Sequence, residues 1–361
     1  MPEAGFPTFR ERTVICTTAK CWPPMPWCLM SCCVLLPDFS RRSPERMPRP
    51  EHTGSYGIIL FLRGISYLPM PVLYLISSLL SPLMEHVIRY RRKTVDRNLH
   101  NAFPDKSLSE RRQIRKRFYR HFTDLMIETL KALHWDSRKI MRRMSFRNEE
   151  LLHELVKNGQ PVLVASGHVG NWEWMNAYNR LGSVPIHPVY KYFADPVFDR
   201  LLYRSRSRLG AQPVPMKKTF RVVKEYQEEG KPGIFCFLAD QCPLQHETEY
   251  WTQFLNQDTA VYLGIEKLSR RFGLPVVFMA IRKTKRGHYE VEFSKITGPA
   301  EQTPPLHITE THVRMLESLI LENPQYWMWS HRRWKHSQAD IPRKKSLYLD
   351  QEGIRTPVFK D

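Results

Sequence analysis

Beyond residue 145 the sequence becomes a series of short apolar runs that alternate with stretches of helical periodicity. This alternation constrains the fold most, because it is typical of α/β proteins, in which helices cover a central sheet. The expected strands are 161–165, 184–189, 233–238, 275–281 and 289–293. The expected helices are 171–181, 196–209, 218–229, 259–272 and 308–322, and glycines at 182, 210, 230 and 273 stand where four of them should end. We therefore expect a mixed central sheet flanked by helices.

An apolar segment precedes this part of the chain. Residues 56–87 are dominated by Ile, Leu, Phe, Met and Tyr, and the run from Arg63 to Met84 just reaches the length of about 20 residues that spans the hydrocarbon of a bilayer. Prolines at 69, 71 and 82 interrupt it, so a spanning helix, an interfacial helix, a hydrophobic hairpin and a buried pair of core helices all remain open. The basic cluster at 89, 91, 92, 93 and 97 stands where the positive-inside rule expects the cytoplasmic side.

A long helix is predicted next. Ser107 and Glu110 have the spacing of a capping box, and apolar residues recur at helical intervals from Ile114 to Met126, so the helix should run to about Leu133. Its other face is basic, with Arg111, Arg112, Arg115, Lys116, Arg117 and Arg120. Such a run is usually a solvated face, but beside an apolar anchor it could also contact anionic lipid or an acidic protein.

The formal net charge of +19 indicates an acidic partner: nucleic acid, anionic lipid headgroups, or an acidic carrier protein or phosphorylated substrate. Five of the seven cysteines lie within the first 33 residues, and their spacings match neither a disulfide framework nor a zinc site. We expect no metal and no other cofactor. Residues 1–52 are assigned no fold and are expected to be disordered or an artefact of a start site upstream of Met47, and residues 337–361 are expected to form a loose polar tail.

The segment from Ser166 to Trp174 carries the candidate chemistry. His168 follows a buried strand on a turn that contains two glycines, Asn171 is a suitable N-cap, and Glu173 would lie in the first turn of the next helix. The functional interpretation is a dyad, in which Glu173 orients His168 and His168 removes a proton from an attacking hydroxyl. The structural interpretation is a capped helix start with a favourable carboxylate and core tryptophans, and the residue types alone favour neither.

Four blocks together resemble the lipid A biosynthesis acyltransferases, the late lauroyl/myristoyl transferases. They are the His-x4-Glu motif at 166–173, the Tyr190-Lys191 block that runs to Gly210, the Leu238-Ala-Asp-Gln241 block, and the closing stretch 324–335 with its His-Arg-Arg-Trp-Lys end. The resemblance covers roughly residues 56–336. It implies an α/β sandwich like that of glycerolphosphate acyltransferases, with an acyltransferase domain at 94–336 behind a membrane-associated segment at 53–93.

The resemblance also implies an activity, a location and partners. The enzyme would transfer a fatty acyl chain from acyl carrier protein to a hydroxyl of a lipid A precursor, at the inner membrane with its catalytic domain in the cytoplasm. His168 and Glu173 would be catalytic. The candidate substrate-binding residues are Asn171, Lys191, Arg204, Arg208, Asp240, Arg332 and Arg333, beside His331. Among them, arginines suit phosphate because they bind it in a bidentate way.

Each candidate has a structural alternative: a solvated helix face for Lys191, Arg204 and Arg208, a strand-end turn for Asp240, and cations stacked on tryptophans for the closing stretch. Two other functions stay open. One is acyl transfer to a different glycolipid or an aminolipid, which residue types cannot reject. The other is a non-catalytic protein that binds anionic lipid. Nucleic acid is not an expected partner, since no nucleic-acid-binding motif is present.

Overall fold

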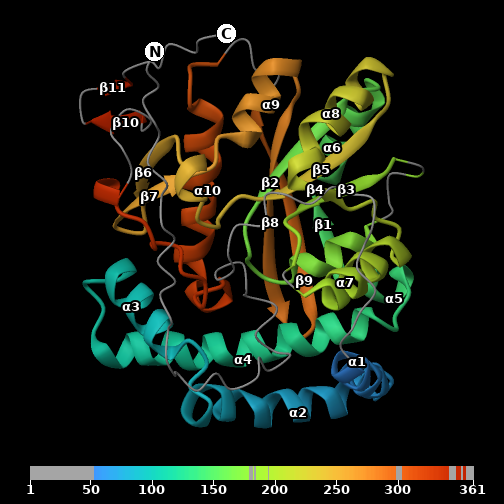
Figure 1. The fold of residues 1–361 in the computed structure, drawn as a ribbon, viewed down its shortest axis with the longest axis vertical. Coiled ribbons are helices and arrows are strands. Elements are labelled where there is room, and N and C mark those ends of the chain that lie inside the picture. Colours follow the sequence, from blue (N-terminus) through green and yellow to red (C-terminus); the bar gives the residue numbers. More distant parts are fainter. Residues whose placement is uncertain are drawn as a thin grey trace, which may run out of the picture.

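The computed structural model describes residues 53–178, 182, 184–193, 195–297, 303–340, 347–350 and 353–354. Expectations for residues 1–52 and for most of the tail beyond 340 lie outside this part of the chain. Figure 1 shows a central sheet with helices on both faces and the long helix α4 (Leu108–Ala132) running beneath it. The mixed α/β architecture expected from the alternating pattern is confirmed.

The central sheet contains seven strands in the order β1-β9-β8-β2-β5-β3-β4. Their bounds are β1 Met144–Arg147, β2 Pro161–Ser166, β3 Ile186–Tyr190, β4 Val214–Pro215, β5 Gly233–Leu238, β8 Val276–Lys285 and β9 His288–Thr297. Only β8 and β9 pair in antiparallel fashion, as a hairpin, and the other neighbours are parallel. All six residues of β2 are buried, because helices cover both faces of this central strand. The carboxyl end of β2 is therefore shielded from solvent by these helices, and in open α/β sheets a ligand site forms at this end of the strands.

A second, smaller sheet corrects one expectation. It contains β6 (Tyr250–Phe254) and β7 (Gln257–Val261), which form an antiparallel hairpin, and β10 (Leu347–Asp350) with β11 (Gly353–Ile354). Residues 259–261 thus belong to a strand, and the helix expected at 259–272 begins only at α9 (Gly264–Phe272). Within the predicted polar tail, the described residues 347–350 form β10, which pairs with β6 in parallel.

Three of the helices expected around the sheet are confirmed: α7 Pro196–Arg208, α8 Thr219–Glu228 and α10 His307–Glu322. The structure adds α3 Arg92–Ala102, α5 Ser137–Met141 and α6 Glu149–Lys157, for which the sequence analysis gives no prediction. The capping box of α4 is present, since Ser107 and Glu110 bond to each other's backbone N–H groups. The helix expected at 171–181 is instead a 3-10 helix, η3, over Trp172–Ala177. Here the Asn176 amide donates to the Glu173 carbonyl at 2.7 Å and competes with the backbone bonds of an α-helix.

The apolar segment forms α1 (Thr53–Ser66) and α2 (Met70–Pro82), which continues through a π-helical turn, η2 (Leu83–Val87). By length and composition alone, Met70–Val87 could cross a membrane. In the structure, however, α2 lies lengthwise against α4, as Figure 1 shows. Its inner side carries Ser77, whose hydroxyl donates to Asp124 on α4 at 2.7 Å.

Candidate active site

His168 lies on the turn that follows β2, and two glycines shape this turn. A Cβ atom on Gly167 would lie 2.6 Å from a methyl group of Leu316 on α10, so a larger residue there would displace that buried side chain. Gly170 has a φ of +64°, and a Cβ there would lie 2.7 Å from Ile281. The tight turn that these two glycines permit therefore places the His168 imidazole at the carboxyl end of β2.

The carboxylate that contacts the His168 ring belongs to Asp240. Its Oδ1 lies 2.6 Å from Nδ1 of the ring, and its Oδ2 accepts the backbone N–H of His168 at 2.8 Å. Asp240 follows β5, the neighbour of β2, so the parallel pairing brings the two strand ends together. Burial alone would raise the pKa of Asp240, but the charge of His168 and the hydrogen bonds it receives lower that pKa well below its ordinary value.

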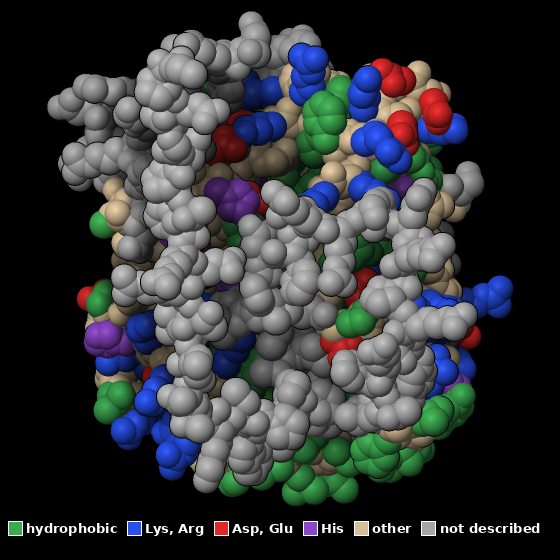
Figure 2. Space-filling view, viewed as in Figure 1, with side chains coloured by type: hydrophobic (Ala, Val, Ile, Leu, Met, Phe, Trp, Pro, Cys, Tyr) green, Lys and Arg blue, Asp and Glu red, His purple; other side chains and the backbone are tan. Residues whose placement is uncertain are grey.

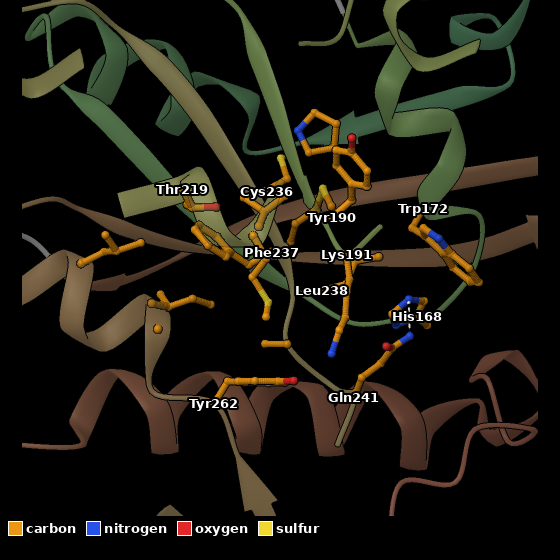
Figure 3. Close-up of a pocket in the computed structure, with 18 of the residues that line it drawn as sticks. His168, Trp172, Tyr190, Lys191, Thr219, Cys236, Phe237, Leu238, Gln241 and Tyr262 are labelled. Atoms are coloured by element: carbon orange, nitrogen blue, oxygen red, sulfur yellow. Dashed lines mark hydrogen bonds between the residues drawn. The ribbon is translucent and has the colours of Figure 1, made fainter. Parts of the chain in front are cut away.

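These contacts determine which ring nitrogen can act as a base. An ionised Asp240 carboxylate only accepts hydrogen bonds, so Nδ1 of His168 carries the proton that it shares with Asp240. Nε2 then holds a lone pair, and the side-chain amide of Gln241 lies 3.2 Å from it. Figure 3 shows His168 and Gln241 facing each other at the rim of a pocket. The ring is thus oriented to take a proton from a group in that pocket.

Residues 326–331, in the closing stretch of the chain, make further hydrogen bonds to Asp240 and to the segments next to it and next to His168. The Trp327 indole donates to Asp240 Oδ2 at 2.7 Å, and the carbonyl of Tyr326 accepts the backbone N–H of Gly170 at 3.1 Å. His331 is buried, and its Nε2 accepts the backbone N–H of Cys242, two residues after Asp240. The sequence did not single out Trp327 for this role. Its position inside an aromatic stretch gave no sign that its indole nitrogen would meet a carboxylate 87 residues away.

Glu173 lies at the same end of the pocket but pairs with Arg206 on α7. The Arg206 guanidinium donates to both Glu173 oxygens, at 2.5 and 3.2 Å, and both side chains are 12% exposed. A His168–Glu173 hydrogen bond is not among those of the described residues, so the sequence-predicted dyad remains a prediction. Burial lowers the pKa of Arg206, but the adjacent Glu173 charge outweighs it and raises that pKa above its ordinary value.

Asn171 has a structural position. Its side-chain oxygen caps η3 by accepting the backbone N–H of Trp174, as expected for an N-cap, and its amide donates to Glu128 of α4 at 2.6 Å. Glu128 is fully buried and also accepts the hydroxyls of Tyr74 and Tyr289. Burial raises the pKa of Glu128, and these donors oppose that rise. Asn171 therefore joins the turn that carries His168 to α4.

The structure separates the remaining predicted residues. Lys191 lines the pocket near Gln241, as Figure 3 shows. Arg204 is exposed on α7, and Arg208 donates to the carbonyls of Ala132 and Trp135 at the end of α4.

In the closing stretch, Arg332 is exposed and Arg333 is buried next to Cys242. Neither arginine is among the residues that line the pocket. Sequence reasoning thus placed Lys191 at the pocket but missed Arg206, which occurs in the same block two residues after Arg204. The signal available was its helical register, because Arg206 and Leu202 are four residues apart and both face the pocket.

The pocket has a volume of about 840 Å³ and extends away from His168 between β3, β5, α8 and α9. Figure 3 places His168, Trp172 and Gln241 at one end, and Thr219, Cys236 and Phe237 at the other. The polar lining includes His168, Glu173, Asn176, Lys191, Arg206 and Gln241, together with four charged residues of α9, Glu266, Lys267, Arg270 and Arg271. The apolar lining includes Ile186, Met216, Phe220, Phe237, Leu238, Leu263, Ile265, Leu268, Met279 and Leu306. A ligand with a polar reacting group and a long apolar chain matches this division.

The Glu173–Arg206 pair leads to a stability prediction. Replacing Arg206 by leucine leaves the Glu173 carboxylate nearly buried without its cation, so we expect the free energy of unfolding to fall by about 3 kcal/mol. The Arg206→Leu, Glu173→Leu double variant should regain part of this loss, because it buries no unpaired charge. Denaturant unfolding of the three proteins measures the coupling, and equal losses for the single and double variants would contradict it.

Comparison with known proteins identifies the family of this chain. Residues 43–336 match the family described as bacterial lipid A biosynthesis acyltransferase. The chain is also 26% identical over 282 residues to the lipid A biosynthesis lauroyltransferase of Escherichia coli (strain K12), covering 77% of this chain and 90% of that protein. The matched region includes the His168 turn, the Asp240 strand end and the closing stretch that joins them. The chain therefore belongs to the bacterial lipid A biosynthesis acyltransferase family and is an enzyme that transfers acyl groups.

Proposed function

We propose that this enzyme transfers a fatty acyl chain from acyl carrier protein to a hydroxyl group of a lipid A precursor, with His168 as general base. The observation that carries the proposal is the His168–Asp240 pair at the mouth of a deep apolar pocket. Family membership supports the acceptor class. The fold that the sequence resemblance implies, a sandwich like that of glycerolphosphate acyltransferases, is compatible with the seven-stranded sheet.

The proposed reaction proceeds in two steps. Nε2 of His168 takes the proton of the acceptor hydroxyl while the hydroxyl oxygen attacks the carbonyl carbon of the acyl thioester. The tetrahedral intermediate then collapses, the carbon–sulfur bond breaks, and the thiolate takes the proton from the imidazolium. The products are an ester and a free thiol. Asp240 stabilises the imidazolium during the intermediate, and its two further donors keep it in place.

The polar end of the pocket can also serve the negative charges of the reaction. The Gln241 amide, 3.2 Å from Nε2, lies close to where the carbonyl oxygen of the thioester would become an oxyanion. Lys191 and the Arg206–Glu173 pair line the same end and could bind phosphates of the acceptor. The sequence-based candidates Arg204, Arg332 and Arg333 do not line the pocket, so they are not part of this proposed phosphate site.

The acyl chain would occupy the apolar part of the pocket. Side chains from β5, α8 and α9, such as Phe237, Phe220 and Leu268, line this part, so a hydrocarbon chain bound against them would be largely removed from water. The thioester would then remain at the His168 end.

Three further parts of the proposal follow from charge and sequence. An acidic carrier protein is a suitable donor for a chain with a net charge of +19. The location is the inner membrane, with the acyltransferase domain at 94–336 on the cytoplasmic side, because the anionic cytoplasmic leaflet attracts the basic cluster that follows the apolar segment. Residues 53–93 would provide the attachment to the membrane.

Lipid mass spectrometry tests the acceptor. Lipid A from cells that lack the gene should lose one acyl chain, and a plasmid with the wild-type gene should restore it. If lipid A is unchanged while another glycolipid or an aminolipid loses an acyl chain, the acceptor is wrong although the reaction class is right. The purified enzyme should use acyl carrier protein thioesters in preference to acyl-coenzyme A. Equal turnover with both donors would contradict the carrier as the specific donor.

A further inference from the structure

An apolar stripe runs along the outer side of α2 and η2. Val72, Leu75, Leu79, Leu83 and Val87 are exposed, and their spacing of three or four residues places them on one face of the helix. Met70–Val87 contains 18 residues, so the stripe is about 27 Å long at the rise of an α-helix. Exposed Leu60, Phe61 and Tyr67 on and after α1 extend it. Figure 2 shows these hydrophobic side chains gathered along the lower edge of the molecule, where Figure 1 places α1 and α2.

The inner side of the same segment makes polar contacts at its start, middle and end, beside the buried apolar residues Met70 and Leu73. Near its start, Lys131 donates to the carbonyls of Ser66 and Leu68. In its middle, Tyr74 donates to Glu128 at 2.9 Å, and at its far end Glu85 forms an ion pair with Arg115. If α2 crossed the bilayer, it would draw these charges into hydrocarbon or would lose all of these contacts, and either change is unfavourable.

Basic side chains flank one end of the stripe. Arg89, Lys93, Arg97, Lys116 and Arg120 are exposed, and none of them forms an ion pair with another residue in the part of the chain that the structure describes. In Figure 2, Lys and Arg side chains lie next to the hydrophobic edge at the lower left, where Figure 1 places α3 and the beginning of α4. An apolar stripe with a basic flank is complementary to the acyl and headgroup regions of an anionic lipid surface.

We infer that α1 and α2 lie in the plane of the membrane and dock the enzyme on an anionic bilayer, with the stripe in the acyl region and the basic flank on lipid phosphates. A second copy of the chain fits this face less well, because packing stripe against stripe would cover the apolar residues without supplying anionic groups to the basic flank, whereas an anionic bilayer supplies both. The docking face also reaches the active site. Glu128 binds Tyr74 of α2 on one side and Asn171 of the turn that carries His168 on the other.

Vesicle flotation of the full-length protein tests the occupant of this face. We expect the wild type to bind phosphatidylethanolamine/phosphatidylglycerol vesicles more strongly than phosphatidylcholine vesicles. Leu79→Glu should lower the partition coefficient about tenfold or more, because a charge replaces a buried leucine. Leu321→Glu is the matched control, since Leu321 is 52% exposed on α10 and Leu79 is 67% exposed. Equal binding by both variants, or a stable dimer that Leu79→Glu dissociates, would overturn the inference.

Site-directed labelling tests the orientation of α2. Leu68→Cys and Arg89→Cys place thiols just before and just after the stripe, and peptide mass spectrometry separates them from the native cysteines. An impermeant maleimide should label both positions from the cytoplasmic face in inverted membrane vesicles. Labelling of one position only from the opposite face would show a spanning helix and refute the in-plane arrangement.

This inference rests on the proposed function only in placing the acceptor in a membrane, and its failure can be separated from failure of that function. Leu79→Glu should keep wild-type turnover, within about twofold, on detergent-dispersed substrates, because Leu79 is remote from the pocket lining. Vesicle binding without any acyl transfer would contradict the proposed function and leave the docking face standing. Acyl transfer without vesicle binding would contradict the docking face and leave the proposed function supported.

Discussion

Replacing His168 by alanine is expected to lower kcat for acyl transfer by about 10² to 10⁴-fold, the usual contribution of a positioned general base. The substitution removes the ring that Asp240 contacts through Oδ1 and leaves the acceptor hydroxyl without a group to take its proton. The acyl pocket remains, so binding of the acyl donor should change much less than kcat. Steady-state kinetics with purified protein, together with lipid analysis of complemented cells, measures the effect.

A matched control and a fold check make this result interpretable. His246→Ala removes an exposed histidine outside the pocket lining and should keep wild-type turnover. Circular dichroism should show that His168→Ala is folded, since the turn around it is held by Gly167, Gly170 and Asn171 as well as by the ring. If a folded His168→Ala protein restored the missing acyl chain in cells at the wild-type rate, His168 would not be the base.

Replacing Asp240 by asparagine should produce a loss of similar size, about 10² to 10⁴-fold in kcat, through the tautomer of the ring. Asp240 Oδ2 accepts two donors, the His168 backbone N–H and the Trp327 indole, so the amide oxygen of asparagine would occupy that position. Its NH₂ group would then face Nδ1 of His168. The ring proton would then reside on Nε2. A protonated Nε2 cannot accept the proton of the acceptor hydroxyl, so the ring would no longer act as a base.

The Glu173→Gln variant tests whether Glu173 or Asp240 orients the His168 ring. If Asp240 orients the ring, Glu173→Gln should lower kcat less than Asp240→Asn does, and it should act through Arg206 on substrate affinity or stability. Nitrogen NMR of the imidazole provides an independent signature, because it distinguishes protonation of Nδ1 from that of Nε2. A shift to the Nε2–H tautomer in Glu173→Gln, but not in Asp240→Asn, would support the dyad that the sequence predicts and contradict the structural pairing.

Local patterns were sufficient for many elements of this fold. The buried strand β2, the glycine-containing turn with His168, the N-cap Asn171 and the capping box of Ser107 all depend on residues near one another in the chain. Their preferences act over a few residues, so periodicity and spacing predict them. Residues 259–261, predicted as the start of a helix, belong to β7, because its pairing with β6 is a tertiary contact that outweighs the local pattern.

The sequence by itself determined the α/β class, the strand-end position of His168 and the presence of an apolar segment beside a basic one, because each is written in local periodicity, spacing or charge. Only the tertiary structure decided the partners. Parallel pairing of β2 with β5 brings Asp240 to His168, α7 brings Arg206 to Glu173, and α4 binds the polar side of α2. These contacts join side chains separated by 33 to 72 residues, and such pairs are selected by how whole elements pack rather than by the residues next to them.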